Sequence, residues 1–494
     1  MRSAKPSPAR QPSTAGPSSS GQLTGICTHS SECREAVSRC GPVRAPDYSS
    51  LQLPRSRNVV HHRTMRIVQL TPGTGSFHCG ACIRDNTLVT ALRELGHDAV
   101  IVPLYLPMTL DEPNPTPEAP LLFGGINVYL QHKSRLFRKT PAWVDRLLNS
   151  PALLKSAAKR AGMTSAADLG ALTLSTLRGE EGLQAKEVEK VVGWLSEGEK
   201  PDVVCLSNVL LVGLARRLRQ ATGAAVVCTL QGEDSFLDSL PEPERTQCWE
   251  TLIDRCREVD AFIPPSRYYG EVMTGRLRLP PENVHVVHNG INLDGYAPAA
   301  EPPDPPVLGF FARQCHNKGL GTLVEAYLEL RRNGGVAGLK FRVAGTQTAE
   351  DATYVAGLRA RLSANGLGSD VEFLPNLDRD QKIAFLRSLS VLSVPATYGE
   401  SFGLYVVEAL AAGVPVVQPH HAAFPELVEI TGGGVLCEPD DPVALARAVE
   451  GLLRDPAEAR AMGERGRQVV LREFSARRMA EGVVTALVCA RGGR

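Results

Sequence analysis

The sequence carries almost no net charge and contains no long apolar run. Its 54 lysines and arginines balance 53 aspartates and glutamates, which leaves a formal charge of +1. The overall charge therefore gives no indication of a nucleic-acid partner. No run of about 20 apolar residues is present, so we expect no membrane-spanning helix. The 12 cysteines are dispersed, unlike those of a disulfide-stapled scaffold, and this favours the cytoplasm as compartment.

A chain of 494 residues is too long for a single core, which indicates at least two domains. Residues 1–64 are rich in Ser, Pro, Arg and Gly and lack apolar periodicity, so we expect a disordered N-terminal extension. They contain no apolar segment typical of a secretory signal. The first apolar strand begins at Met65, which is an alternative start for the protein.

The first domain is expected over residues 65–298, where short apolar strands alternate with helices. The expected strands are 65–70, 98–105, 201–208, 224–230, 259–266 and 284–290, and the expected helices are 82–96, 209–222 and 242–258. Such alternation is typical of a parallel, doubly wound sheet. Residues 110–198 interrupt it and are interpreted as a helical insertion. Its basic part, around 133–160, would be a solvated helix face or a peripheral contact with an anionic membrane.

A second α/β domain is expected over residues 299–474, after a proline-rich linker at 297–307. The expected strands are 307–312, 339–345, 371–376, 390–395, 414–419 and 433–439, and the expected helices are 319–332, 350–365, 380–389, 402–412, 442–453 and 456–472. Residues 475–494 read as one more helix. The pattern predicts an α/β protein with two doubly wound, Rossmann-like domains.

Two glutamates flank a Ser-Phe-Gly-Leu turn in the second domain. Glu400 lies on the loop between a strand and a helix, and Glu408 lies about two turns into that helix among apolar residues. A carboxylate in such a place needs a partner or a ligand. The helix begins beside Gly403 and Leu404, where free backbone N–H groups favour an anion. The pattern indicates a site for a ligand with hydroxyls and phosphate. The alternative is a solvated charge at Glu400 and a dipole-stabilised charge at Glu408.

Arg313 and Lys318 follow the first strand of the second domain. Ligands of open α/β sheets bind at this edge. A guanidinium fork and an ammonium point charge suit a diphosphate, although two exposed basic residues are an equal reading of this pair alone.

A glycine-rich loop follows the first strand of the first domain, in which Gly73, Gly75 and Gly80 permit a close approach to the cleft. Cys79 and Cys82 form a Cys-x-x-Cys pair at the start of the next helix. The pair could be redox-active, half of a zinc site, or ordinary loop packing. Because no second pair with zinc-finger spacing follows, packing is favoured and we expect no metal site.

The order of these motifs over residues 65–490 resembles that of the retaining glycosyltransferases of family 4, the group 1 transferases, with their Glu-x7-Glu signature. The resemblance implies the GT-B fold, with two Rossmann-like domains facing across a cleft and the helix at 475–494 crossing back to the first domain. It also implies metal-independent transfer of a hexosyl group from a UDP-, GDP- or ADP-sugar, with no cofactor, to a sugar, lipid or small-molecule acceptor. The alternatives are another sugar-nucleotide enzyme of this fold, such as an epimerase or a phosphorylase, and a non-catalytic binding protein.

The resemblance also assigns roles to residues. Arg313, Lys318 and Glu400 would be catalytic, the first two on the diphosphate and Glu400 on the transferred sugar. The remaining donor contacts would come from Glu408 on the ribose and from Phe402, Gly403, Leu404 and Gly75. Relatives often carry a cleft histidine where this chain has Gln231. The acceptor-side candidates are therefore His78, Gln231, Glu233 and Asp234, and for the last two a helix cap is an equal reading.

Overall fold

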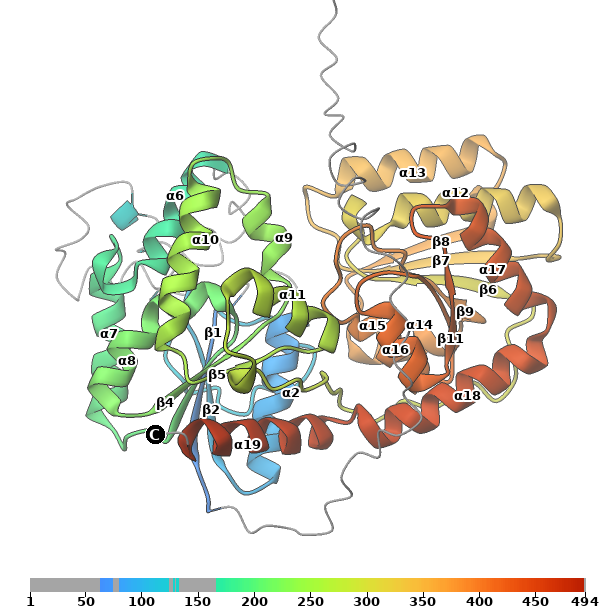
Figure 1. The fold of residues 1–494 in the computed structure, drawn as a ribbon. Coiled ribbons are helices and arrows are strands. Elements are labelled where there is room, and N and C mark those ends of the chain that lie inside the picture. Colours follow the sequence, from blue (N-terminus) through green and yellow to red (C-terminus); the bar gives the residue numbers. More distant parts are fainter. Residues whose placement is uncertain (1–62, 74–79, 124–127, 129, 133–165, 493–494) are drawn as a thin grey trace, which may run out of the picture. The chain divides into compact units, whose positions relative to one another are not determined.

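The computed structural model describes the chain except for residues 1–62, 74–79, 124–127, 129, 133–165 and 493–494 (Figure 1). The expected extension at 1–64 therefore lies almost wholly outside the described residues, as does the basic segment at 133–160. Residues 63–494 form one compact unit, which contains two parallel sheets.

The first sheet has five parallel strands in the order β2-β1-β3-β4-β5. The strands are β1 (Arg66–Thr71), β2 (Asp98–Pro103), β3 (Val203–Leu206), β4 (Ala225–Thr229) and β5 (Ala261–Ile263). They are short, nearly continuous apolar runs, as expected for strands covered on both faces.

Helices cover both faces of this sheet. One face packs against α2 (Gly80–Glu94) and α19 (Ala476–Gly492), with Ile67, Leu88 and Leu487 in a shared core. The other face packs against α6 (Ala166–Leu177), α7 (Ala185–Glu197), α8 (Ala215–Thr222), α10 (Glu244–Arg255) and α11 (Arg267–Leu277). The last helix of the chain, red in Figure 1, thus completes the core of the first sheet.

The structure corrects two expected elements of the first domain. Residues 284–290 form no strand: Val284 makes an isolated bridge to Phe262, and His285 and Val287 donate backbone hydrogen bonds to Phe262 and Pro264 without forming a continuous ladder. The helix expected at 209–222 is a 3₁₀ turn, η4 (Val209–Leu214), followed by α8. The described end of the segment expected as an insertion at 110–198 contains α6 and α7. Helix α7 leads directly into β3 and packs in the core, so it is the crossover helix that a parallel pair of strands requires.

The second sheet has six parallel strands in the order β11-β10-β9-β6-β7-β8. The strands are β6 (Val307–Phe311), β7 (Lys340–Gly345), β8 (Val371–Pro375), β9 (Val391–Leu392), β10 (Val416–Pro419) and β11 (Gly434–Cys437). The helices are α12 (Leu320–Asn333), α13 (Ala352–Ala364), α14 (Arg379–Arg387), α15 (Leu404–Ala411), α16 (Phe424–Thr431), α17 (Pro442–Arg454) and α18 (Pro456–Glu473). The two sheets with their covering helices confirm the predicted fold class.

Local sequence signals explain where the helices near the site begin. Helix α14 starts with a capping box, because Asp378 accepts from the backbone of Gln381 while the Gln381 side chain accepts from the backbone of Asp378. Helix α15 starts at Gly403, whose left-handed φ of 93° suits a glycine. Both starts follow the carboxyl ends of strands, where a site in this fold is expected.

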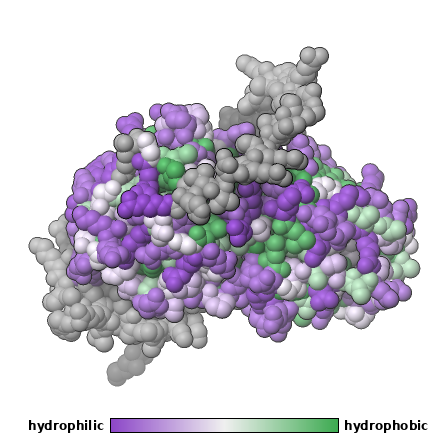
Figure 2. Space-filling view, turned by 90° about the horizontal axis from the view of Figure 1, so that it is seen from below, coloured by the Kyte–Doolittle hydropathy of each residue, from purple (hydrophilic) through white to green (hydrophobic). Residues whose placement is uncertain are grey.

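The face of the molecule seen in Figure 2 is mainly hydrophilic, with hydrophobic residues in small separate groups. Among the described residues, the exposed large hydrophobic side chains are Leu169, Val286, Val443 and Val488. No helix in the described part of the chain is both long and apolar enough to cross a bilayer.

Candidate active site

Arg313 follows β6 at the carboxyl edge of the second sheet. Its Nε and Nη2 donate to the two carboxylate oxygens of Asp351 over 3.1 Å each. The backbone N–H and hydroxyl of Thr348 donate to the same carboxylate. Burial by itself would raise the pKa of the Asp351 carboxyl, but the hydrogen bonds from Arg313 and Thr348 outweigh it and lower that pKa. Arg313 is thus held in one orientation while 41% of its side chain stays exposed.

Lys318 ends the 3₁₀ turn η7 (His316–Lys318) that precedes α12. Its ammonium contacts Oε2 of Glu400 and the hydroxyl of Tyr398. The hydroxyls of Tyr398 and Tyr405 also donate to Oε2 of Glu400, each over 3.0 Å. Burial raises the pKa of the Glu400 carboxyl, and the charge of Lys318 more than offsets this, so that the pKa lies below its ordinary value. Lys318 and Glu400, 82 residues apart in sequence, form a charged pair at the predicted site.

The turn between Glu400 and α15 places backbone amides next to this pair. The side chain of Phe402 is buried in the core, so only its backbone remains for the site. Gly403 caps the helix in the left-handed region, and a side chain there would also press on Phe424 at 3.3 Å. Leu404 opens the helix, where the first N–H groups lack partners within the helix. This end of α15 is a suitable place for a phosphate.

Glu408 lies one turn further along α15 and is held by protein partners. Its Oε1 accepts from Lys382 Nζ over 2.8 Å and from the Tyr296 hydroxyl over 3.2 Å. Only 12% of its side chain is exposed. The sequence reasoning required a partner for this carboxylate, and α14 supplies one.

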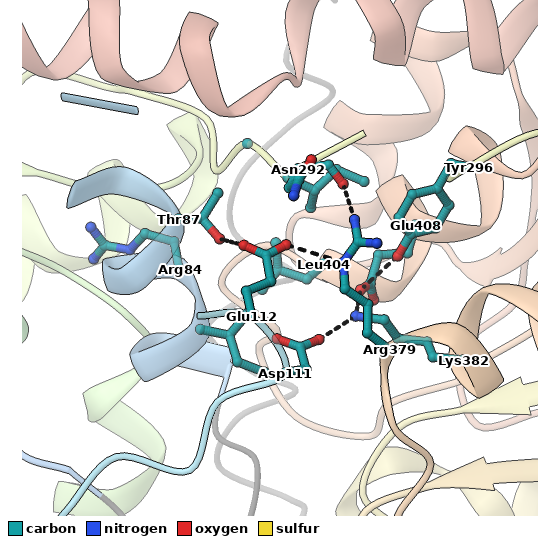
Figure 3. A pocket seen from close by; sticks show the side chains of 13 residues that line it. Arg84, Thr87, Asp111, Glu112, Asn292, Tyr296, Arg379, Lys382, Leu404 and Glu408 are labelled. Carbon is teal, nitrogen blue, oxygen red and sulfur yellow. Dashed lines mark hydrogen bonds and ion pairs between the residues drawn. The ribbon is translucent and has the colours of Figure 1, made fainter. Parts of the chain in front are cut away.

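Glu408 lines a small pocket to which both sheets contribute (Figure 3). Its lining combines α2, the loop after β2, residues 290–296, α14 and α15. Four residues in it were missed by the sequence analysis: Asp111, Glu112, Arg379 and Lys382. The sequence offered two signals for them. The first is an acidic pair soon after a strand, and the second is a pair of cations three residues apart at a helix start.

The acidic acceptor-side candidates on the loop after β4 accept hydrogen bonds from the protein itself. Glu233 is buried, and its carboxylate accepts from the N–H groups of Val209, Gln231 and Gly232. Asp234 accepts from the hydroxyl of Tyr269, as Glu233 does. Burial raises the pKa of the Glu233 carboxyl, and these hydrogen bonds only partly offset the effect. Glu233 therefore stabilises the backbone of its own loop and the start of η4, and the acceptor contacts of Glu233 and Asp234 stay predictions.

The same loop nevertheless lies beside the Glu400 turn. A side-chain carbon added at Gly232 would lie 3.3 Å from the Ser401 hydroxyl. The Ser266 hydroxyl donates to the carbonyl oxygen of Ser401 over 2.7 Å. Gln231, which precedes Gly232 in this loop, is therefore close in sequence to the contact between the two halves.

Three residues of the glycine-rich loop, Gly75, His78 and Cys79, lie outside the described residues. Cys82 is described: it is buried in the first turn of α2, with its sulfur 3.8 Å from the Thr71 hydroxyl. Within the described ranges, no group of three or more His, Cys, Asp or Glu side chains is placed to hold a metal ion.

Two family models match consecutive parts of the chain. "Glycosyltransferase Family 4" matches residues 176–294 and "Glycosyl transferases group 1" matches residues 297–469. The boundary between the two matches falls at the junction between the two sheets.

Curated relatives and solved structures agree with these matches. The glycogen synthase of Mycobacterium tuberculosis is 27% identical over 318 residues, which cover 63% of this chain and 73% of the relative. A D-inositol 3-phosphate glycosyltransferase of Streptomyces avermitilis is 30% identical over 197 residues, which cover 36% of this chain and 41% of the relative.

Sucrose-phosphate synthase of Thermosynechococcus elongatus superposes with a TM-score of 0.64 at 19% identity, covering 87% of this chain and all (100%) of the other. Anabaena HepE in complex with UDP and glucose superposes with a TM-score of 0.59 at 16% identity, covering 86% and 99%. At such identities the two structures show a common fold.

Proposed function

Because the chain belongs to the family 4 glycosyltransferases of the GT-B fold, we propose that it transfers a hexosyl group from a nucleotide-sugar donor with retention of configuration. The observation that carries the proposal is the Lys318–Glu400 pair beside the start of α15. It combines a cation, a carboxylate and helix N–H groups, which suit a phosphate and a sugar hydroxyl together.

In this proposal Arg313 and Lys318 bind the diphosphate of the donor. Both side chains contact carboxylate oxygens in the structure, those of Asp351 and Glu400, and a phosphate oxygen is the same kind of charged acceptor. The start of α15 adds partial positive charge on the same side. Cations fixed in this way need no metal ion to neutralise the phosphates, so we propose a metal-independent reaction.

The reaction breaks the bond between the anomeric carbon and the diphosphate oxygen. Negative charge grows on the departing phosphate, where Arg313, Lys318 and the amides at Gly403 and Leu404 stabilise it. The acceptor hydroxyl attacks the anomeric carbon from the face that the phosphate leaves, and its proton passes to a phosphate oxygen. Glu400, kept ionised by Lys318, orients hydroxyls of the transferred sugar, and no side chain forms a covalent intermediate.

Glu408 is the proposed ligand of the ribose hydroxyls. Glu400 lies on the loop before α15 and Glu408 lies one turn into the helix, so the two carboxylates flank the helix start that is proposed to bind the diphosphate. The Anabaena neighbour is solved in complex with UDP-glucose as well, which makes UDP-glucose the first donor to test. The cytoplasm remains the proposed compartment.

The test is a thermal-shift screen of UDP-, GDP- and ADP-sugars, followed by turnover with the donor that binds. A ligand that binds the native state alone raises the melting temperature. We expect one nucleotide class to do so, turnover to survive EDTA, and the product to keep the anomeric configuration of the donor by NMR. A protein that no nucleotide sugar stabilises, or an inverted product, would contradict the proposal.

A further inference from the structure

Helix α14 presents two cations to the other half of the molecule. Arg379 and Lys382 are three residues apart, so they share one face of the helix. Arg379 Nε lies 3.3 Å from Glu112 Oε1, and Lys382 Nζ lies 2.7 Å from Asp111 Oδ2. These contacts join positions 267 and 271 residues apart in sequence (Figure 3).

The ammonium of Lys382 is shared between two carboxylates. It donates to Asp111 and also, over 2.8 Å, to Glu408, the proposed ribose ligand. All three side chains are buried, with exposures of 11% for Lys382, 8% for Asp111 and 12% for Glu408. Burial by itself would lower the pKa of Lys382, but the two carboxylates outweigh it, so the side chain stays charged.

The acidic pair belongs to the first domain and is fixed there. The loop after β2 that carries Asp111 and Glu112 is held by Asn86 Nδ2, which donates to the Pro113 carbonyl over 3.1 Å. Thr116 exchanges hydrogen bonds with the backbone of Ile101. Asp111 and Glu112 therefore leave α14 only when this part of the first domain moves away from it.

The pocket around these groups is too small for a nucleotide. Its volume is about 20 Å³, which is room for about one water molecule. A ribose is several times larger than water, so a ribose in this pocket would require its lining, which includes Asp111 and Glu112, to move. In addition, Asp111 Oδ1 is buried without a hydrogen-bond partner. That carboxylate gains less from its position than a fully bonded one, which favours its release.

We propose that Lys382 is a positioning residue which holds Glu408 for the ribose, and that Asp111 and Glu112 compete with the donor nucleotide for the cations of α14. Donor binding then requires Asp111 and Glu112 to move away from α14, after which Lys382 donates to Glu408 but no longer to Asp111. This inference rests on the proposed function, because it takes the ribose as the ligand of Glu408. It adds that two carboxylates of the first domain lower the affinity of the donor site for the nucleotide.

The experiment measures the dissociation constants of UDP, GDP and ADP by calorimetry for the full chain and its variants. Lys382→Met should raise the dissociation constant of the nucleotide roughly tenfold or more, and Lys382→Arg should retain part of the affinity. Asp111→Asn and Glu112→Gln should each tighten binding, by about three- to tenfold, because they remove competitors. The opposite directions distinguish competition from a merely structural role.

A matched control uses the ion pair between Lys340 and Asp370, which lies at the opposite edge of the second sheet. Lys340→Met and Asp370→Asn change charge by the same amounts and should leave nucleotide affinity unchanged. Because Lys382→Met leaves two buried carboxylates without their cation, the double variant with Asp111→Asn is measured as well, and melting curves establish that each variant is folded. The double variant should bind no more tightly than Lys382→Met alone, because Asp111 then has no ammonium for which to compete.

Weaker binding by Asp111→Asn, or unchanged affinity in both Lys382→Met and Asp111→Asn, would overturn the inference. Those results leave the proposed function intact so long as the wild-type protein binds a nucleotide and transfers its sugar. A wild-type protein that binds none of the three nucleotides would instead overturn both.

Discussion

Arg313 and Lys318 each hold a carboxylate that fixes their orientation before any ligand arrives. We therefore expect Arg313→Ala and Lys318→Ala each to lower kcat by roughly two orders of magnitude or more, as for loss of a fixed charge that stabilises the leaving group. Steady-state kinetics with the donor found in the screen measure the effect. Arg332→Ala is a suitable control, since Arg332 is 69% exposed and pairs with Glu329 on its own helix. Near-normal turnover in both variants would refute the diphosphate assignment.

The two glutamates should separate binding from turnover. Glu408→Ala should mainly weaken the binding of the nucleoside diphosphate, because Glu408 is assigned to the ribose and is positioned by Lys382 and Tyr296. Glu400→Ala should mainly reduce kcat, because Glu400 is assigned to the transferred sugar. Calorimetric titration with the free nucleoside diphosphate, beside kinetics, tests the division. The opposite pattern, in which only Glu400→Ala loses nucleotide affinity, would exchange the two roles.

At the scale of elements, the start of α11 is capped from another helix. Glu426 of α16 accepts from the N–H groups of Arg267 and Tyr268 over 3.1 and 3.2 Å, and from His288 Nε2 over 2.8 Å. Burial raises the pKa of the Glu426 carboxyl, but the hydrogen bonds from His288 and the helix start outweigh it and lower the pKa. The charged form is therefore the form that stabilises this junction.

Because the pKa of Glu426 is lowered in the folded state, its contribution is present above the ordinary glutamate pKa of about 4.3 and is lost as pH falls below it. Glu426→Gln should lower the free energy of unfolding by ~1–2 kcal/mol at neutral pH, with a difference that shrinks in acid. Denaturant unfolding between about pH 7 and about pH 3 measures this. Glu429→Gln, at an exposed position of the same helix, is the control. A difference that stays constant with pH would show that the charge is irrelevant.

At the scale of the whole molecule, α19 makes the stability of the first domain depend on the last residues of the chain. Leu487 is fully buried between this helix and the first sheet, whereas its neighbour Val488 is 37% exposed. Leu487→Ala should cost about 2–5 kcal/mol, and Val488→Ala less than about 0.5 kcal/mol. Denaturant unfolding of both variants tests this. Equal stability of the two variants would mean that α19 does not contribute to that core.

The sequence alone determined the order of elements, the division into two Rossmann-like halves and the motif residues of the second half. The reason is that those signals are local: alternating strands and helices, Gly403 at a helix start, and Arg313 and Lys318 directly after a strand. Residues 284–290 were mistaken for a strand because their composition suits one, and only the structure showed that they make an isolated bridge and no continuous ladder.

Only the tertiary structure decided which charges meet. Asp111 and Glu112 lie in a loop without a recognisable motif. Lys382 lies in α14, where the capping box is the only local signal in the sequence and indicates no binding role. Their meeting depends on contacts across some 270 residues of chain, as the separations of 267 and 271 residues show. Local propensity carries no information about such a separation, because which side chains meet is set by the packing of one domain against the other. The sequence thus specified the residues of the proposed donor site in the second domain, and the fold placed Asp111 and Glu112 of the first domain against α14.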